Sequence, residues 1–187
     1  MFHNERETRH QRVMAAVDQM MTAARTAPKG KGIDIIEIAA VEGDDIQTLS
    51  AKMSEFGTQE SRKFFLRDSK NILLAEAVLL IGTRRQKQTL DCGYCGFPTC
   101  SSKPEETPCA INSVDVGIAI GSACATAADL RLDTRVMFSA GYAAQALDWL
   151  NGCQTIFAIP VSASSKNPFF DRVILEKDKD TISNKIV

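Results

Sequence analysis

Four of the six cysteines of the chain fall within one short segment, at Cys92, Cys95, Cys100 and Cys109. The two residues between the first pair allow a tight turn that can direct both thiolates at one metal centre. Four thiolates are the ligand set of a [4Fe–4S] cluster, and a structural zinc site can use the same four. The segment lacks histidine, and its spacing differs from the paired C-x2-C motifs of zinc ribbons. The sequence therefore favours an iron–sulfur cluster, with zinc and unliganded thiols open as alternatives.

Two glycines, Gly93 and Gly96, directly follow the first two cysteines. Glycine permits backbone conformations that a β-carbon disfavours, and it lets backbone N–H groups point at sulfur. Hydrogen bonds of that kind stabilise the negative charge of thiolate ligands. We therefore expect Gly93 and Gly96 to tune the metal centre.

The stretch CGYCGFPTC, residues 92–100, resembles the start of the iron–sulfur domain of corrinoid iron–sulfur proteins and some electron-transport subunits. In that domain the fourth cysteine lies further along than Cys109 does here, so Cys124 is the rival fourth ligand. Cys124 falls more than about three turns into the helix predicted after Cys109. We interpret Cys124 as a small buried residue, and Cys153, at the head of a predicted strand, as structural.

Length and composition limit the number of domains and the classes of function that the chain could have. With 187 residues, 44% of them apolar and 24% charged, the chain suits one globular domain over residues 1–187. Residues 83–110 form an inserted iron–sulfur loop in this interpretation. A net charge of −1 argues against a nucleic-acid partner. The only histidines, His3 and His10, lie in the charged first segment, which excludes most Ser–His, Cys–His and His–metal mechanisms. We assign no catalytic residue and expect any reaction to depend on a cofactor.

The first residues are polar and charged, without the basic-then-apolar pattern of a signal peptide. The least polar stretch, Ile111–Leu130, contains Asp115 and Asp129 and lacks the large aliphatic residues of a membrane span. We expect a cytoplasmic protein with no membrane partner. Thiols stay reduced in the cytoplasm, so clustered cysteines favour metal or redox chemistry over disulfides.

Hydrophobic periodicity and glycine or proline breaks outline alternating helices and strands. Helices are predicted over residues 5–25, 44–57, 60–75, 111–130 and 140–150, and strands over 33–41, 76–82, 135–139 and 153–162. Gly57 fits just past the end of the second helix. The alternation predicts an α+β fold with helices on both faces of a central sheet. The long loop that carries the cysteines, residues 83–108, is of a length that is usually functional.

Gly117 and Gly121 stand one turn apart on the predicted helix 111–130. Two glycines at this spacing let another backbone approach closely. We interpret them as tight packing within the domain, with a dimer contact or a ligand against the helix as alternatives.

A second candidate site is the basic turn AARTAPKGKGID, residues 23–34, which contains Arg25, Lys29 and Lys31. In one interpretation the lysines complement the negative end of the preceding helix while the proline and glycines turn the chain. In the other, these cations and the nearby amides hold a phosphate or another anion.

The same turn resembles that of nitroreductases, whose first helix runs into an Ala-Ala-Arg-x-Ala-Pro-Ser turn that touches flavin mononucleotide (FMN). The match covers residues 23–25, 27 and 28, and it ends where Lys29 and Gly30 replace the expected Ser and Asn. Nitroreductases also place a basic residue near the flavin phosphate after the last strand, where Lys166 and Arg172 lie here. The resemblance implies FMN as a further cofactor. Its phosphate, or another anion, would be held by Arg25, Lys29, Lys31 and Lys166.

The segment Thr83–Lys87 is basic and lies beside the cysteines. We interpret it first as a solvated loop, with a docking patch for an acidic redox partner or a counter-charge to an anionic cluster as the alternatives.

From about Met20 to Arg172 the chain is similar to an uncharacterised prokaryotic family described as ferredoxin-domain proteins. The similar stretches are AARTAPKGKG, FFLRDS, CGYCGFPTC, PCAINSVDVGIAIGSA and SKNPFFDR. Together the resemblances imply a nitroreductase-like homodimer with flavin sites shared between subunits. The expected function is [4Fe–4S] electron transfer, in which single electrons pass to FMN in the same domain or to a redox partner protein. A non-catalytic scaffold with a structural four-cysteine zinc site is the alternative.

Overall fold

The computed structural model describes residues 2–170 as five α-helices, one short 3₁₀-helix and four strands. The helices are α1 (Glu5–Thr26), η1 (Gly30–Gly32), α2 (Asp44–Gln59), α3 (Lys63–Ile72), α4 (Ala110–Asp129) and α5 (Phe138–Ala146). The strands are β1 (Ile36–Val41), β2 (Ala77–Arg84), β3 (Asp133–Thr134) and β4 (Cys153–Ser162).

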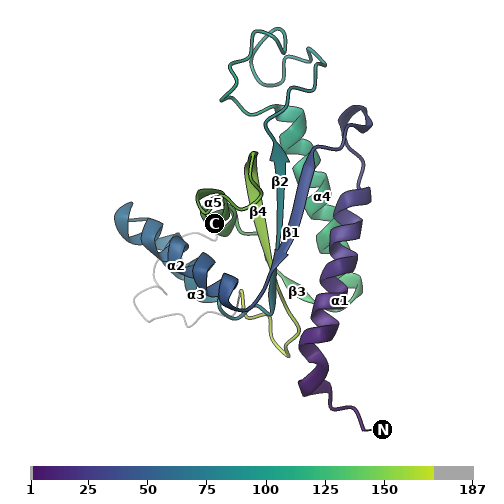
Figure 1. Ribbon diagram of the computed structural model, residues 1–187, viewed down its shortest axis with the longest axis vertical. Helices are drawn as coiled ribbons and strands as arrows, with labels where there is room; N and C mark the ends of the chain where they lie inside the picture. Colours follow the sequence, from purple (N-terminus) through teal and green to yellow (C-terminus); the bar gives the residue numbers. More distant parts are fainter. Residues whose placement is uncertain (1, 171–187) are drawn as a thin grey trace, which may run out of the picture.

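The strands form one antiparallel sheet in the order β1-β2-β4-β3. At one end of the sheet, Ile36 pairs with Thr83, and Arg84 pairs with Cys153. At the other end, Ala77 pairs with Val161. We call the first the loop end, because the cysteine loop leaves from it, and the second the base (Figure 1).

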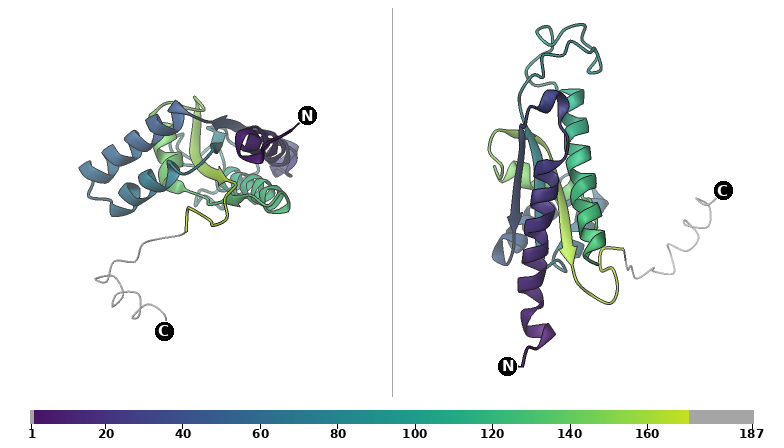
Figure 2. Two further views of the ribbon diagram at one scale, coloured as in Figure 1. Left: turned by 90° about the horizontal axis from the view of Figure 1, so that it is seen from below. Right: turned by 90° about the vertical axis from the view of Figure 1, so that its right-hand side faces the viewer.

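Helices cover both faces of this sheet. Figure 2 shows α1 and α4 side by side over one face, and α2, α3 and α5 over the other. The central strand β2 serves both layers, because Leu79 and Ile81 pack toward α1 and α4 while Val78 and Leu80 pack toward the other helices. All four side chains are fully buried. This arrangement confirms the predicted α+β fold with a helix-covered central sheet.

The first helix is set by its caps and by one apolar face. The Asn4 side chain accepts a hydrogen bond from the Arg6 amide and so caps the start of α1. The buried face of α1 runs from Val13 to Ala24, and the Ser122 hydroxyl of α4 donates to the Ala23 carbonyl at 2.9 Å. This contact fixes the end of α1, and with it the basic turn, against α4.

The strand predicted over residues 135–139 is wrong. Met137 makes only an isolated bridge to Ala158, and α5 begins at the next residue. A β-carbon on Gly141 would lie 1.9 Å from the Ile156 carbonyl oxygen, so α5 rests directly on the backbone of β4. That close helix–strand packing, which no local pattern encodes, overrides the β propensity of the segment.

The predicted end of the second helix at Gly57 is also wrong, since α2 continues to Gln59. Gly57 is buried, and a β-carbon there would lie 2.6 Å from the Leu66 side chain. The glycine therefore allows α2 and α3 to pack closely rather than ending α2.

Helix α4 is long and apolar enough to meet the criteria for a membrane span, with a mean hydropathy of 1.3 over its most apolar window. Core helices of soluble domains meet the same criteria. In this fold α4 packs against α1 and the sheet through Val116, Ala119, Ala123 and Ala127, which are all buried. It also carries Asp115, whose buried carboxylate accepts hydrogen bonds from the Gly30 amide.

The interpretation of Gly117 and Gly121 as tight packing within the domain is wrong. Both glycines are exposed, and a β-carbon at either would have no atom within 4 Å. Val114 and Ile118 are exposed beside them. The outer face of α4 is therefore an apolar strip of small residues with no covering segment among residues 2–170.

Candidate functional site

The cysteine loop comprises residues 85–109, between the end of β2 and the start of α4. It projects beyond the loop end of the sheet, at the top of Figure 1. Cys92 is exposed, Cys95 and Cys100 are half-buried, and Cys109 is buried where the loop meets α4. The four predicted ligands thus share one loop that is attached to the domain at both ends.

The tip of the loop is ordered by its own hydrogen bonds. The Cys100 amide donates to the Asp91 carboxylate at 2.6 Å, and the Asp91 amide donates to the Cys100 sulfur at 3.4 Å. The Gly96 amide donates to the Gly93 carbonyl at 2.9 Å, and the φ angles of Gly93 and Gly96 are 73° and 85°. These positive angles favour glycine. An amide-to-sulfur contact of the expected kind is present, although Asp91 makes it.

The loop does not assemble a metal site by itself. Cys109 is the N-cap residue of α4 and only 6% exposed, whereas the other three cysteines lie in the projecting part. Within residues 2–170, no group of three His, Cys, Asp or Glu side chains is positioned to hold a metal ion. The structure therefore brings the four cysteines into one segment without making them converge.

The remaining two cysteines lie in the core. Cys124 is in α4, fifteen residues after Cys109 and therefore about 22 Å along the helix. Burial raises the pKa of Cys124, and a hydrogen bond with Thr134 opposes the shift only in part. Burial and the charge of Glu37 raise the pKa of Cys153 to about 11. Both thiols are therefore harder to deprotonate than an ordinary cysteine.

The cations of the basic turn after α1 bind partners within the chain. Arg25 donates to the Asp34 carboxylate at 2.9 Å and to the Ile36 carbonyl at 2.6 Å. Burial acts to raise the pKa of Asp34, but hydrogen bonds from Arg25 and from the Ile36 amide outweigh it and lower the pKa. Lys29 donates to the Ala24 and Arg25 carbonyls at the end of α1. Lys29 thus complements the end of α1, as in the first interpretation, whereas Lys31 does not contact it.

Lys31 links the turn to the cysteine loop. Its ammonium donates to the Gln88 carbonyl at 3.3 Å and to the Thr89 hydroxyl at 3.2 Å. Lys166, in contrast, follows β4 at the base of the sheet. The eight residues of β2 place the two ends about 26 Å apart. Within one chain, Lys166 therefore lies far from Arg25, Lys29 and Lys31, and Arg172 lies outside the described residues.

The segment Thr83–Lys87 is held by acidic and backbone partners. Arg84 forms an ion pair with Glu37, and Arg85 forms one with Glu106 at 3.0 Å. Lys87 donates to the Ser101 carbonyl at 3.4 Å. These contacts tie the start of the cysteine loop to β1 and to the later part of the loop.

The junction between η1, the loop and α4 buries polar groups. Asn112 donates from its side chain to the Gln86 carbonyl at 2.7 Å, while its own carbonyl oxygen has no partner. Gln88 is 1% exposed, and neither of its side-chain polar atoms has a partner. Buried polar groups are usually paired with protein, water or a bound group. Nothing in the sequence around Gln88 distinguishes it from a solvated loop residue.

Asp115 fixes the same junction. It is 3% exposed, and the Gly30 amide donates to both of its carboxylate oxygens at 3.0 and 3.1 Å. A β-carbon on Gly30 would lie 2.6 Å from the Ile111 side chain, so the turn passes very close to α4. Burial raises the pKa of Asp115, and the Gly30 hydrogen bond and Lys29 oppose the shift only in part.

This shift predicts a pH dependence of stability. Over a range just above pH 3.8, the folded chain keeps a proton on Asp115 that the unfolded chain has released. The stability that this group contributes therefore falls as the pH rises through that range. Asp115→Asn, which cannot titrate, is expected to show a flatter dependence. Urea unfolding at several pH values between about 4 and 6 measures the free energy of unfolding of both proteins. An equal change of that free energy with pH in the two proteins would contradict the prediction.

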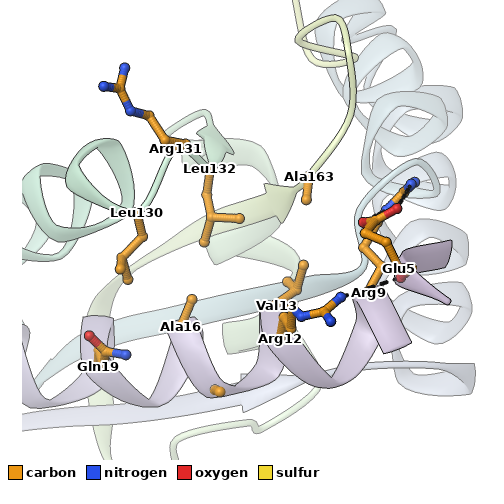
Figure 3. A pocket seen from close by; sticks show the side chains of 11 residues that line it. Glu5, Arg9, Arg12, Val13, Ala16, Gln19, Leu130, Arg131, Leu132 and Ala163 are labelled. Atoms are coloured by element: carbon orange, nitrogen blue, oxygen red, sulfur yellow. Dashed lines mark hydrogen bonds and ion pairs between the residues drawn. The ribbon is translucent and has the colours of Figure 1, made fainter. Parts of the chain in front are cut away.

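A groove lies at the base of the sheet, between the first half of α1 and the turn from α4 to β3. Its volume is about 390 Å³. Figure 3 shows Val13 and Ala16 on one wall facing Leu130 and Leu132 on the other. The remaining lining residues are Glu5, Arg9, Arg12, Ala15, Gln19, Arg131 and Ala163. We call this cavity the arginine groove.

Arginines surround one end of the arginine groove. A second hollow of about 440 Å³ continues from it and adds Arg6, Ser164 and Ser165. The Arg9 guanidinium is held by Glu5 in a two-pronged ion pair at 2.7 and 2.8 Å. The positions of Arg6, Arg9 and Arg12 at three-residue intervals on a helix are a sequence signal for this surface.

Comparison with known proteins places the chain. A family model described as an uncharacterized protein containing a ferredoxin domain, DUF2148, matches residues 105–172, which include Cys109 but not the other three candidate ligands. An uncharacterized protein of Archaeoglobus fulgidus is 37% identical over 182 residues, covering 92% of this chain and 98% of that protein.

Solved structures show the fold. A nitroreductase with bound FMN from Desulfitobacterium hafniense is 14% identical with a TM-score of 0.56, covering 88% of this chain and 84% of that one. An FMN-dependent nitroreductase from Clostridium difficile is 16% identical with a TM-score of 0.53, covering 92% and 86%. The antiparallel sheet with helices on both faces is thus a nitroreductase fold. From its long match to the archaeal relative and the family model over its last third, the chain belongs to the DUF2148 family of ferredoxin-domain proteins.

Proposed function

We propose that the protein is an iron–sulfur redox protein that transfers single electrons through a [4Fe–4S] cluster. The ligands are Cys92, Cys95, Cys100 and Cys109. The observation that carries this proposal is the donor set: four thiols lie in one loop, and an amide already donates to the Cys100 sulfur. The description of the family as containing a ferredoxin domain supports it.

The residues of the loop fit such a cluster in their chemistry. When bound, a [4Fe–4S] cluster supplies one-electron chemistry over potentials of roughly −700 to +450 mV. The Asp91 amide stabilises the Cys100 thiolate, and the buried position of Cys109 limits the access of water to that side. The unpaired side-chain amide of Gln88 and the unpaired side-chain carbonyl oxygen of Asn112 give the junction spare hydrogen-bonding capacity. Because the thiols do not converge in the chain alone, metal binding is coupled to closure of the loop.

We place FMN in the arginine groove. The groove combines apolar walls, suited to a flat ring system, with arginines at one end, suited to a phosphate. Lys166 follows directly after Ser165 at this end and is retained as a phosphate ligand. Proteins that share the fold are described as holding FMN. The basic turn at Arg25 contributes less in this proposal, because its donors already have protein partners.

Charge removal at the groove tests this placement. Arg12→Gln combined with Arg131→Gln is expected to weaken FMN binding about tenfold to a hundredfold, the cost of losing one or two charged hydrogen bonds. Quenching of flavin fluorescence measures the affinity. Lys52→Gln, on the exposed face of α2, is the matched control and leaves the affinity unchanged. Equal affinities in all three proteins would place the flavin elsewhere.

We also propose a homodimer that forms through the outer face of α4. The exposed strip of Val114, Gly117, Ile118 and Gly121 allows a second helix to approach closely. The redox partner remains a proposal as well, with Thr83–Lys87 as its docking region beside the loop. The proposed location is the cytoplasm, where the thiols stay reduced for cluster assembly.

Metal analysis of protein purified without oxygen tests the main proposal. The expected preparation is brown, contains about four iron atoms per chain, and bleaches with dithionite. A colourless preparation with one zinc per chain would overturn the proposal in favour of a structural metal site. A yellow chromophore released on denaturation would identify the flavin independently of the iron.

A further inference from the structure

The cysteine loop contains a buried lysine. Lys103 lies between Cys100 and Cys109 and is only 5% exposed. Its ammonium donates to the Pro104 carbonyl at 3.1 Å and to the Thr107 carbonyl. Lysine is almost never this buried unless it is paired. A loop on the outside of the domain would be expected to direct such a side chain into solvent.

The ammonium of Lys103 has no carboxylate partner in the described part of the chain. Its two hydrogen-bond acceptors are neutral carbonyls. Glu105 lines the same small cavity but forms no ion pair with it, and the neighbouring Glu106 is bound by Arg85. Lys87 lines this cavity too, which adds a second positive charge. The local charge around Lys103 is therefore not balanced by the chain.

An uncompensated buried charge costs several kcal/mol. A fold tolerates that cost when an anion compensates the charge in the functional state. Four thiolates concentrate negative charge in this loop, and Thr107, which accepts from Lys103, stands two residues before Cys109. Two residues span at most about 7 Å. The ammonium is thus held near the place where a cluster bound through Cys109 would lie.

We propose that Lys103 is the counter-charge of the metal cluster and sets its reduction potential. This inference rests on the proposed iron–sulfur function. Reduction adds one electron from the donor to the cluster, and no bond at Lys103 forms or breaks. A fixed positive charge nearby stabilises the more negative, reduced state more than the oxidised state. Lys103 therefore raises the potential, and it acts through its charge without ligating the metal.

Variants at position 103 separate the charge from the hydrogen bonds. Lys103→Gln keeps N–H donors for the two carbonyls but removes the charge, Lys103→Arg keeps the charge, and Lys103→Met removes both. Lys87→Gln is the matched control, because it removes an equal charge from a less buried position in the same loop. Each protein is purified without oxygen, its iron is counted, and the cluster is titrated by spectroelectrochemistry.

At a potential where half of the wild-type cluster is reduced, the ratio of reduced to oxidised cluster is expected to fall at least about tenfold in K103Q. That ratio corresponds to a shift of about 59 mV for a one-electron couple. K103M shifts in the same direction, K103R stays close to wild type, and K87Q changes the ratio by less than about threefold because solvent screens its charge.

The outcomes distinguish this inference from the function on which it rests. Wild-type protein that holds no iron would overturn the iron–sulfur function itself. Iron-loaded K103Q with the wild-type potential would overturn the counter-charge role and leave the iron–sulfur function standing. Loss of iron from K103Q but not from K103R would support the role, since charge is then needed to hold the cluster. Loss of iron from K103Q and K103R alike would overturn it, because the loop then requires the shape of lysine.

Discussion

Replacing Cys109 with serine is expected to abolish the brown chromophore of the protein purified without oxygen. Iron should fall from about four atoms per chain to less than one. Cys109 joins the projecting loop to α4, so in the proposed cluster it would be the ligand that anchors the metal centre to the domain. Only three of the four proposed ligands remain in the variant, whereas a [4Fe–4S] cluster is held by four cysteine thiolates. Iron analysis and the absorbance between about 380 and 420 nm measure the loss.

The loss of iron from Cys109→Ser is not expected to result from unfolding of the domain. Cys109 occupies the N-cap of α4 without a side-chain capping hydrogen bond, and serine is a favoured N-cap residue. The metal-free variant should therefore unfold at the melting temperature of the metal-free wild-type protein or slightly above it. Cys124→Ser is the matched control, because it changes the rival cysteine while leaving the loop intact. If Cys124→Ser lost the iron and Cys109→Ser kept it, the fourth ligand would be assigned to α4.

Replacing Gly141 with alanine is expected to destabilise the fold by on the order of 3 kcal/mol, the upper range for overpacking a core. The added β-carbon would lie 1.9 Å from the Ile156 carbonyl oxygen and 2.7 Å from the Phe157 α-carbon. Both contacts are with the backbone of β4, so no side-chain rotation can relieve them, and α5 must move off the sheet. For a chain of this size the melting temperature should fall by about 6–12 °C.

Gly121→Ala is the control for this prediction. It makes the same change in a helix, but the new methyl group meets no atom within 4 Å. Alanine favours a helix by up to about 1 kcal/mol over glycine, so as a monomer this variant should match or exceed the wild-type melting temperature. Because Gly121 lies in the proposed dimer face, the proteins are compared at a concentration at which they are monomers. Calorimetry at one protein concentration compares the three proteins. Equal melting temperatures for Gly141→Ala and wild type would show that α5 does not contact β4 so closely.

Several elements of this fold could be predicted from the sequence because local signals determine them. Helix α1 begins at the predicted Glu5, where Asn4 caps it and an apolar stripe repeats at helical spacing. Strand β4 has the predicted bounds, Cys153–Ser162, because asparagine and glycine precede a continuous apolar run. The start of α5 and the role of Gly57 could not be predicted in this way. They depend on contacts with Ile156 and Leu66, which lie far away or in the next helix.

The candidate site likewise has features that the local sequence predicts and features that it does not. The cysteines could be placed in one loop because their spacing is a local property. In the proposed function, their convergence would depend on a bound metal. The sequence leaves Arg25 and Lys29 either an anion or the end of α1 as a partner. In the structure both bind nearby backbone carbonyls, a choice that the local sequence does not determine. Lys166 lies at the same end of the sheet as the arginine groove, because β4 runs from the loop end to the base. Strand direction within a sheet is a property of topology and not of local sequence.

The length of α4 has a consequence for electron transfer between the two proposed cofactor sites. The helix starts beside the cysteine loop and ends beside Arg131 of the arginine groove, and its twenty residues span about 30 Å. In a single molecule, an electron on the proposed cluster would therefore be remote from a flavin bound in the arginine groove. Two copies related by a two-fold axis across α4 would run these helices in opposite directions. The proposed iron centre of each copy would then lie beside the flavin site of the other. Dilution to monomers would stop electron transfer between the two cofactors, although both would stay bound.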